Sequence, residues 1–230
     1  MIAPPESEAQ LLERAKALTG RPLGWVAETV GLEAPPDLRR HKGWVGQLLE
    51  RALGATAGSR AEPDFPQLGI ELKSIPVDQL GVPQESTFVC TAPLDDSLAS
   101  HWEESWVFRK LSCVLWAPVV GVGKTPVAQR IVGPPLLWRP HEAEQRLLRD
   151  DWEELSGLIR RGEIGDINAR RGEVLQLRPK AAHSRERTWM LDEEANWVQA
   201  NPRGFYLRQR FTKTLMARHF SAEGGRSVPP

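Results

Sequence analysis

Apolar residues recur at helical spacing through the first part of the chain. A helix is predicted to begin after Ser7, where Ser-Glu-Ala-Gln has the pattern of a capping box and an apolar stripe follows. A second helix is predicted over residues 23–32, and a third over residues 42–53, where Trp, Val and Leu side chains form one helical face. Glu50 is therefore expected near the end of the third helix.

A loop rich in Gly, Ala, Ser and Pro separates these helices from segments with strand character. Strands are predicted over residues 68–77, 86–92, 112–120, 129–138, 173–178 and 204–210. Residues 142–161 predict a long amphipathic helix, a polar loop is expected between residues 178 and 204, and a last helix is predicted over residues 212–220. These elements predict an α+β (mixed α/β) fold with a mainly β core.

The chain has 230 residues, of which 40% are hydrophobic, so it can bury the core of one domain or of two lobes. We expect residues 221–230 to form a mobile tail. The sequence shows no apolar stretch of membrane-spanning length and no signal-peptide profile, which predicts a soluble, cytoplasmic protein. Cys90 and Cys113 lie in apolar runs, where buried, reduced thiols are expected.

Overall charge does not indicate a nucleic-acid partner, because 30 basic and 30 acidic side chains cancel. Any DNA-binding surface would have to be a local basic patch. One candidate near the end of the chain is equally well explained as a solvated face. It consists of Arg203, Arg208, Arg210, Lys213 and Arg218.

The most informative pattern joins two carboxylates and a lysine. Pro63-Asp64 is followed by Glu71-Leu72-Lys73 within a predicted strand. Side chains two residues apart on a strand share a face, so Glu71 and Lys73 would point the same way, toward Asp64 brought close by a short turn. This arrangement suits phosphodiester cleavage. The alternative is a solvated surface pair on an edge strand, with Asp64 as a turn residue.

Two carboxylates, a phosphate oxygen and waters would complete the octahedral oxygen shell that a magnesium ion prefers. Such an ion polarises the phosphate and lowers the pKa of a bound water, while Lys73 would position or deprotonate the attacking water. Glu50 could add a ligand for a second metal ion or an outer-shell ligand, which spacing alone does not decide.

These residues resemble the PD-(D/E)-x-K nuclease pattern, and their wider context is similar to the MutH family of mismatch repair endonucleases. The resemblance runs from about residue 4 to residue 220. It is carried by separated motifs in the same order, among them Lys42-Gly-Trp, Gly-Ile-Glu-Leu-Lys-Ser-Ile-Pro-Val-Asp, Thr-Phe-Val-Cys, Asp-Trp-Glu-Glu-Leu, Leu-Arg-Pro-Lys-Ala-Ala and Pro-Arg-Gly-Phe-Tyr-Leu.

The resemblance implies metal ligands at Asp64 and Glu71, a catalytic Lys73, a supporting carboxylate at Glu50 and a second active-site lysine at Lys110. It implies a restriction-endonuclease-like mixed sheet flanked by helices, with residues 1–220 forming one nuclease domain whose two lobes enclose a DNA cleft. The implied activity is magnesium-dependent nicking of the unmethylated strand at hemimethylated GATC sites. The implied partners are MutL and, indirectly, MutS, acting on a monomer associated with the nucleoid.

Arg178-Pro179-Lys180 ends an apolar strand and would project two cations from a stiff turn. A guanidinium matches the two acceptors on the major-groove edge of guanine, so Arg178 is a candidate for base recognition. Its alternative is a salt bridge to a phosphate or a carboxylate. Lys180 could contact bases or backbone equally well.

Tyr206 is the only tyrosine, and it lies among basic residues. The resemblance places it where adenine methylation is sensed, and an aromatic face against the adenine edge would exclude an added methyl group sterically. Without the family, a half-buried strand residue is the ordinary expectation. Phe88 and Lys42 match other DNA-contacting positions of the family, although Phe88 would ordinarily be assigned to the core.

Competing functions remain. A restriction-type enzyme on the same fold would cut both strands independently of MutL, and a catalytically inactive DNA-binding module would lack Asp64, Glu71 or Lys73. Residues 183–201 resemble the family poorly, so site preference could differ. Residues 121–125 (Gly-Val-Gly-Lys-Thr) lack the first glycine of a phosphate-binding loop, and a hairpin turn is expected there instead. The scattered histidines give no zinc-binding spacing.

Overall fold

The computed structural model divides the chain into two compact units, each built from separate stretches of sequence. Unit 1 comprises Met1–Glu85, Ser112–Arg139 and Lys213–Pro230, and unit 2 comprises Ser86–Leu111 and Pro140–Thr212. The structure describes residues 2–58, 60, 62–121, 123–168, 170–180, 186–194 and 196–222.

The helices of unit 1 follow the sequence pattern closely. The first three are α1 (Glu8–Ala17), α2 (Leu23–Thr29) and α3 (Trp44–Leu53). Ser7 caps α1, because its hydroxyl accepts a hydrogen bond from the Gln10 amide at 3.2 Å. Gly54 ends α3 in the left-handed conformation, with φ 83°. The predicted position of Glu50 near the end of a helix is therefore confirmed.

The sheet of unit 1 contains β1 (Glu71–Val77), β3 (Val114–Val120), β4 (Ile131–Val132) and β5 (Leu136–Trp138). β1 pairs with β3 in parallel, and β4 and β5 both pair antiparallel with β3. β4 returns antiparallel beside β3, and the turn expected at residues 121–125 lies in part outside the described residues. The single strand predicted over residues 129–138 is wrong, because Pro134 and Pro135 have no amide protons for a strand ladder.

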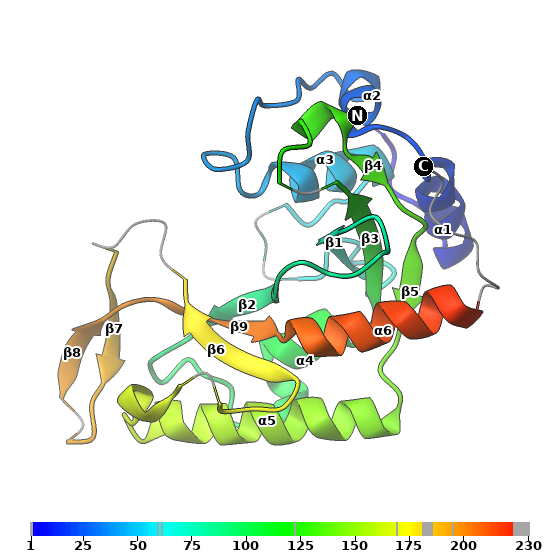
Figure 1. The fold of residues 1–230 in the computed structure, drawn as a ribbon. Helices are drawn as coiled ribbons and strands as arrows, with labels where there is room; N and C mark the ends of the chain where they lie inside the picture. The colour runs from blue at the N-terminus through cyan, green and yellow to red at the C-terminus, as the bar shows by residue number, and fades with distance from the viewer. Residues whose placement is uncertain are drawn as a thin grey trace. The chain divides into compact units, whose positions relative to one another are not determined.

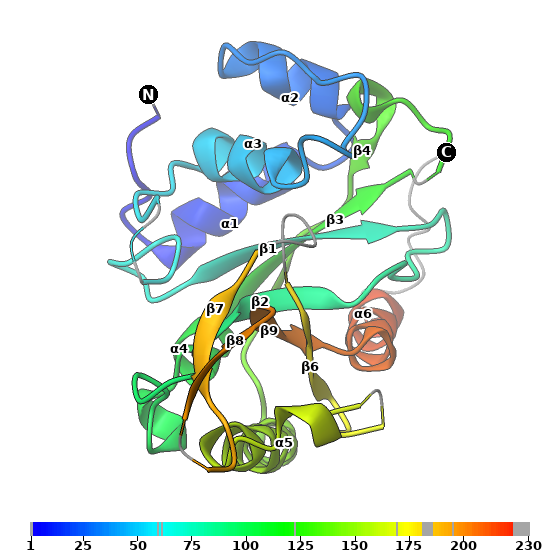
Figure 2. The same ribbon diagram turned by 90° about the vertical axis from the view of Figure 1, so that its left-hand side faces the viewer.

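The core of unit 1 lies between its helices and one face of this sheet. α1 and α3 lie along that face in Figure 2, and α3 packs on β1. Leu72 of β1 and Leu115 of β3 are register partners and belong to the same buried cluster as Leu48 and Leu49 of α3. Because side chains alternate along a strand, the neighbours of Leu72 project from the opposite face of β1.

Unit 2 is built on a second sheet, of β2 (Thr87–Ala92), β9 (Arg203–Leu207) and β6 (Leu175–Pro179), with β9 in the middle. Both pairings are antiparallel. α5 (Glu142–Arg160) matches the predicted long helix and packs against β6, as Figure 1 shows in yellow-green below the sheet. β7 (Thr188–Leu191) and β8 (Trp197–Ala200) form a separate antiparallel hairpin.

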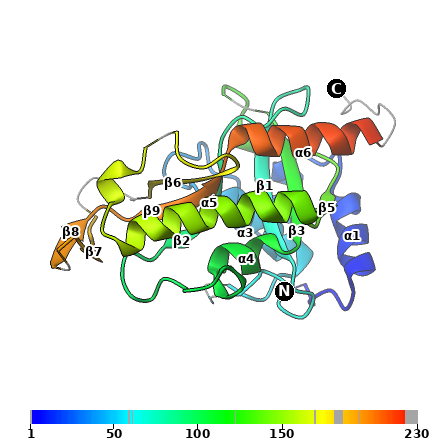
Figure 3. The same cartoon turned by 90° about the horizontal axis from the view of Figure 1, so that it is seen from below.

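α4 (Trp106–Leu111) packs on β2 and lies near α5 in Figure 3. Trp102 links these helices through ring contacts with Phe108 at 5.6 Å and Trp152 at 5.8 Å between centroids. Sequence analysis missed α4, and the polar loop predicted between residues 178 and 204 is wrong in part because it contains the β7–β8 hairpin.

The remaining elements are three short 3-10 helices and the last α-helix. The 3-10 helices are η1 (Trp102–Glu104), η2 (Val127–Gln129) and η3 (Ile164–Asp166). α6 (Gln209–Ala222) begins earlier than predicted, and the part of the predicted tail from residue 223 onward lies outside the described residues. The predicted α+β class is confirmed.

Both cysteines are buried thiols, as the apolar runs around them indicate. Burial raises the pKa of the Cys113 thiol above its usual value. Among the described residues, no helix has the length and apolar character needed to cross a membrane.

Candidate active site

A tight turn brings Asp64 beside the start of β1. Phe65 and Ile70 form an antiparallel bridge in which the Phe65 amide donates to the Ile70 carbonyl at 2.9 Å, and Gly69 adopts the left-handed conformation at φ 63° that such a turn requires. Asp64 and Glu71 are the residues just outside this bridge. The Leu72 amide donates to Asp64 Oδ2 at 2.8 Å, which holds the carboxylate against the first residues of β1.

Glu71 and Lys73 form an ion pair on the face of β1 opposite Leu72. Lys73 Nζ lies 2.5 Å from Glu71 Oε1, and the exposed fractions of these side chains are 13% and 2%. β1 is an edge strand of its sheet, as the alternative interpretation supposed, but Glu71 is buried and Lys73 is partly buried, so the pair is not a solvated surface pair. Removing two charges from water has a desolvation cost, and most charged side chains therefore stay exposed at the surface. A largely buried ion pair is thus a candidate for a functional role.

Glu50 lies on α3, the helix that packs against β1. Its carboxylate turns back along its own helix, because Oε1 would lie 3.7 Å from a Cβ added at Gly46. Within the part of the chain that the structure describes, no three His, Cys, Asp or Glu side chains are grouped as a metal site. The roles of Asp64, Glu71 and Glu50 as metal ligands therefore stay a prediction.

A second cluster of predicted residues assembles on the sheet of unit 2. Phe88 of β2 and Tyr206 of β9 are register partners, and their rings meet edge to face with centroids 5.3 Å apart. The Arg178 guanidinium lies 5.5 Å from the Tyr206 ring centroid, and Lys180 Nζ lies 3.9 Å from that of Phe88. Pro179 joins these two cations and is exposed as they are. The fold thus brings the two aromatic and two cationic candidates together, and Phe88 is only partly buried.

A glycine makes this arrangement possible. Gly204 of β9 pairs with Arg178 on one side and Thr91 on the other. A Cβ at Gly204 would lie 2.8 Å from a ring carbon of Phe88, which is closer than real Cβ contacts come. The Phe88 ring therefore covers the backbone of β9 next to Tyr206, where any larger residue would displace it.

Two residues that support this cluster were missed from the sequence. Gln176 is the register partner of Tyr206 on β6, and its Nε2 donates to Ser86 Oγ at 2.9 Å. Asp151 of α5 is buried and accepts backbone hydrogen bonds from residues 173, 174 and 175 at 2.6 to 2.7 Å. The even spacing of Gln176 and Arg178 along a strand was a signal for the first. Nothing in the sequence indicated the second.

The remaining predicted residues occupy separate places. Lys42 is exposed just before α3 in unit 1, whereas the partly buried Lys110 lies on α4 in unit 2. In the basic cluster near the end of the chain, the guanidiniums of Arg208 and Arg210 donate to the carbonyls of Arg171 and Glu173. These contacts hold the segment before β6, and burial lowers the pKa of Arg208.

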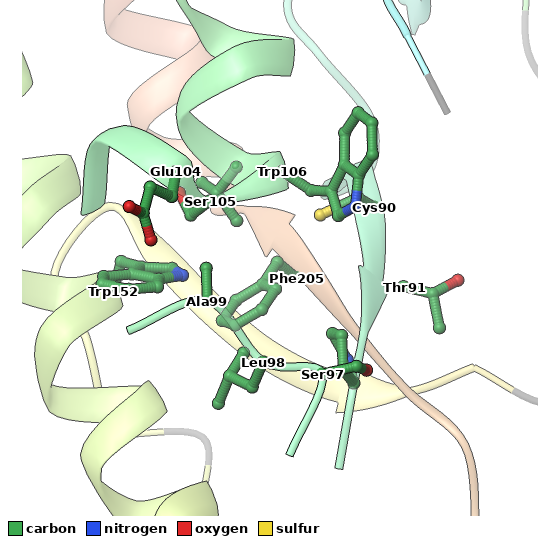
Figure 4. Close-up of a pocket in the computed structure, with 12 residues that line it drawn as sticks. Cys90, Thr91, Ser97, Leu98, Ala99, Glu104, Ser105, Trp106, Trp152 and Phe205 are labelled. Atoms are coloured by element: carbon green, nitrogen blue, oxygen red, sulfur yellow. The ribbon is translucent and has the colours of Figure 1, made fainter. Parts of the chain in front are cut away.

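Unit 2 also contains a small pocket of about 70 Å³. Figure 4 shows Leu98, Trp152 and Phe205 among the side chains around it, with Glu104 and Ser105 at one side. None of the predicted site residues lines this pocket. Its position thus gives no support to a role in the chemistry predicted from the sequence.

The structure places two carboxylates and a lysine where a tight turn enters a strand of an α+β fold, which is the arrangement expected from the resemblance to the PD-(D/E)-x-K nucleases. A family model described as "DNA mismatch repair enzyme MutH" matches residues 53–151.

Whole-length relatives give the same family. The chain is 55% identical over 217 residues to the DNA mismatch repair protein MutH of Serratia proteamaculans, covering 94% of this chain and 95% of that protein. It is 53% identical over 220 residues to MutH of Escherichia coli K12, covering 96% of each. The chain therefore belongs to the MutH family, and its assignment as a mismatch repair endonuclease is confirmed.

Proposed function

We propose that the protein nicks the unmethylated strand of double-stranded DNA at hemimethylated GATC sites, with magnesium as cofactor and under the control of MutL and, indirectly, MutS. The observation that carries this proposal is the buried Glu71–Lys73 pair beside Asp64 in a chain of the MutH family. We further propose that it acts as a monomer on the bacterial nucleoid in the cytoplasm.

The donor set fits a magnesium ion. Asp64 and Glu71 offer carboxylate oxygens, the ligands that this hard cation prefers, and the backbone of Leu72 holds the first of them beside β1. Glu50 would contribute from α3 as a supporting ligand. When bound, the ion would polarise the scissile phosphate and lower the pKa of a bound water.

Lys73 supplies the remaining part of the chemistry. In the present arrangement its ammonium is held by Glu71 at 2.5 Å, which limits the positions that it can take. On the proposed mechanism the Lys73 ammonium orients the attacking water and offsets the charge that develops on the phosphate, and it could accept the proton of that water only after losing its own proton. Lys110 is proposed as a second active-site lysine, as the resemblance to the family implies.

The cluster on the unit 2 sheet is the proposed DNA-recognition surface. Arg178 suits the major-groove edge of guanine, and its packing on Tyr206 limits the directions in which it can point. Tyr206, partly buried between Phe88 and Arg178, would present a firm aromatic face to adenine and exclude an added methyl group. Lys180, Pro179 and Lys42 are proposed to contact DNA next to this surface.

The test is a nicking assay on a plasmid that carries one GATC site in unmethylated, hemimethylated or fully methylated form. The purified protein is incubated with magnesium, with and without MutL. We expect MutL-stimulated nicking of the unmethylated strand and no cutting of fully methylated DNA. Lys73→Ala should abolish nicking, whereas Lys16→Ala, which removes an exposed lysine of α1, should not.

Other outcomes would identify the competing functions. Cleavage of both strands that ignores methylation and MutL would point to a restriction-type enzyme. DNA binding without cleavage under any of these conditions would point to an inactive binding module. Cutting by Lys73→Ala at the parental rate would remove the assigned role of that lysine.

A further inference from the structure

The β7–β8 hairpin has one buried and one exposed face. Its register pairs Met190 with Val198 on one face, and Trp189 with Gln199 and Leu191 with Trp197 on the other. Met190 is buried, with an exposed fraction of 8%. The opposite face therefore points to solvent, although three of its four side chains are large and apolar.

The exposed face is unusual for the described part of this chain. Trp189 is 55% exposed and Trp197 is 54% exposed, and they sit diagonally across the same face. Tryptophan carries more apolar surface than other side chains and is enriched at the centres of protein interfaces. An isolated exposed apolar residue needs no explanation, but two tryptophans flanking a leucine on one small face indicate a contact surface.

The turn of the hairpin packs against Gly162 and carries negative charge. Gly162, in the left-handed conformation after α5, lies against this turn so closely that a Cβ there would come within 2.3 Å of the Asp192 carbonyl carbon. Asp192, Glu193 and Glu194 follow one another in the turn, and the two glutamates are exposed. The tryptophan face is thus presented from an anchored hairpin that ends in negative charge.

This charge decides between two classes of occupant. A DNA backbone would be repelled by three consecutive carboxylates, because proteins bind DNA mainly through the attraction between its phosphates and their own cations. A protein surface with an apolar groove bordered by lysine or arginine side chains would be complementary to both the tryptophans and the acidic turn.

We propose that the exposed face of the β7–β8 hairpin, with the acidic turn beside it, is the docking surface for the activating partner protein. This inference rests on the proposed function, in which the partner is MutL. The surface of MutL that binds the hairpin would be an apolar groove with a basic rim. Trp189 and Trp197 supply the apolar contact. Glu193 and Glu194 orient MutL on the hairpin and speed its association.

The proposal is tested with purified full-length protein and MutL. The variants are the double substitution Trp189→Ser with Trp197→Ser, and the charge reversal Glu193→Lys with Glu194→Lys. Trp25→Ser is the matched control, because Trp25 is 43% exposed on α2 of unit 1. Affinity for MutL, affinity for GATC-containing DNA without MutL, and nicking with and without MutL are measured for each.

We expect the tryptophan double variant to bind MutL at least tenfold more weakly, which corresponds to losing about 1.4 kcal/mol. Nicking without MutL and affinity for DNA should match the parent, and MutL stimulation should return at higher MutL concentration. The charge reversal should weaken binding mainly by slowing association, and most at low salt. The control should behave as the parent.

Three results would overturn the proposal. Affinity for MutL could stay within twofold of the parent in the double variant. DNA affinity could fall while MutL affinity is unchanged, which would assign the face to DNA. The parent could be a dimer that the tryptophan variant dissociates without any change in MutL binding, which would assign the face to a second copy of the chain. Failure of the proposed function would instead show in the parent, as absent nicking or absent stimulation.

Discussion

The ion pair between Glu71 and Lys73 ties the stability of the protein to its proposed chemistry. Both side chains are largely buried, so removing one leaves the other without its closest opposite charge. Lys73→Ala is therefore expected to lower the free energy of unfolding by about 3 kcal/mol as well as to abolish nicking. Urea denaturation followed by circular dichroism measures the first effect.

A second variant separates the charge from the fold. Glu71→Gln combined with Lys73→Gln removes both charges while keeping groups that can hydrogen-bond to each other, so its stability should lie within about 1 kcal/mol of the parent. Strictly additive losses from the two single substitutions would show that the pair contributes no coupling energy. In that case burial of Glu71 would have to be explained by its other contacts.

The positions of the candidate catalytic residues could be predicted because they follow from short-range rules. Glu71 and Lys73 share a face by strand alternation, and Asp64 is brought near by a turn of a few residues. The stacking of Arg178 on Tyr206 and the position of Gln176 could not be predicted in this way. These contacts depend on the register of β6 against β9, which joins residues far apart in the chain.

The start of β6 depends on a single carboxylate from α5. Asp151 accepts the amides of residues 173, 174 and 175, and β6 then leads to Arg178. Asp151→Ala should lower the free energy of unfolding by about 3 kcal/mol, because buried donors would be left without their charged acceptor. Amide hydrogen exchange at residues 173–175 should become faster, and the preference for GATC over other sequences should fall.

The adjacent Asp150 offers a matched control. It has the same charge and lies on the same helix, but it is exposed. Asp150→Ala is expected to change stability by less than about 0.5 kcal/mol and to leave exchange at residues 173–175 unchanged. Equal effects from the two substitutions would mean that helix charge, rather than the hydrogen bonds of Asp151, stabilises the start of β6.

Most of the long elements were predictable, whereas some short ones, namely α4, β7 and β8, were missed. The apolar stripe of α5 and the capped start of α1 are strong local signals. The segment over residues 129–138 has strand composition, but its prolines divide it into β4 and β5. The β7–β8 hairpin was missed because apolar side chains lie on both of its faces, so no apolar–polar alternation indicated a buried face.

The division into two units could not have been located from sequence. Each unit combines stretches that are separated by stretches of the other, so no linker or change in composition marks a boundary. The two predicted groups of functional residues nevertheless separate along this division. Asp64, Glu71 and Lys73 lie in unit 1, and the aromatic and cationic surface around Tyr206 lies in unit 2. Chemistry and recognition can therefore be tested by separate variants.

The absence of net charge makes DNA binding a test of local electrostatics. With 30 basic and 30 acidic side chains, the molecule as a whole does not attract a polyanion, so binding must come from the cations gathered at the recognition surface. If Lys180 contacts a phosphate, Lys180→Ala should weaken binding to all DNA sequences equally. It should also reduce the slope of log affinity against log salt concentration by about one. Fluorescence anisotropy over a range of salt concentrations measures both.

Arg178→Ala should behave differently under the same measurement. Loss of a bidentate contact to guanine is expected to reduce discrimination against a substituted GATC site by about 1–3 kcal/mol, so that specific and nonspecific affinities converge. Lys16→Ala, on α1 and outside the surface, should change neither quantity. A change in salt slope without a change in discrimination for Arg178→Ala would place this guanidinium on the phosphate backbone, and base recognition would then have to come from Gln176 or Tyr206.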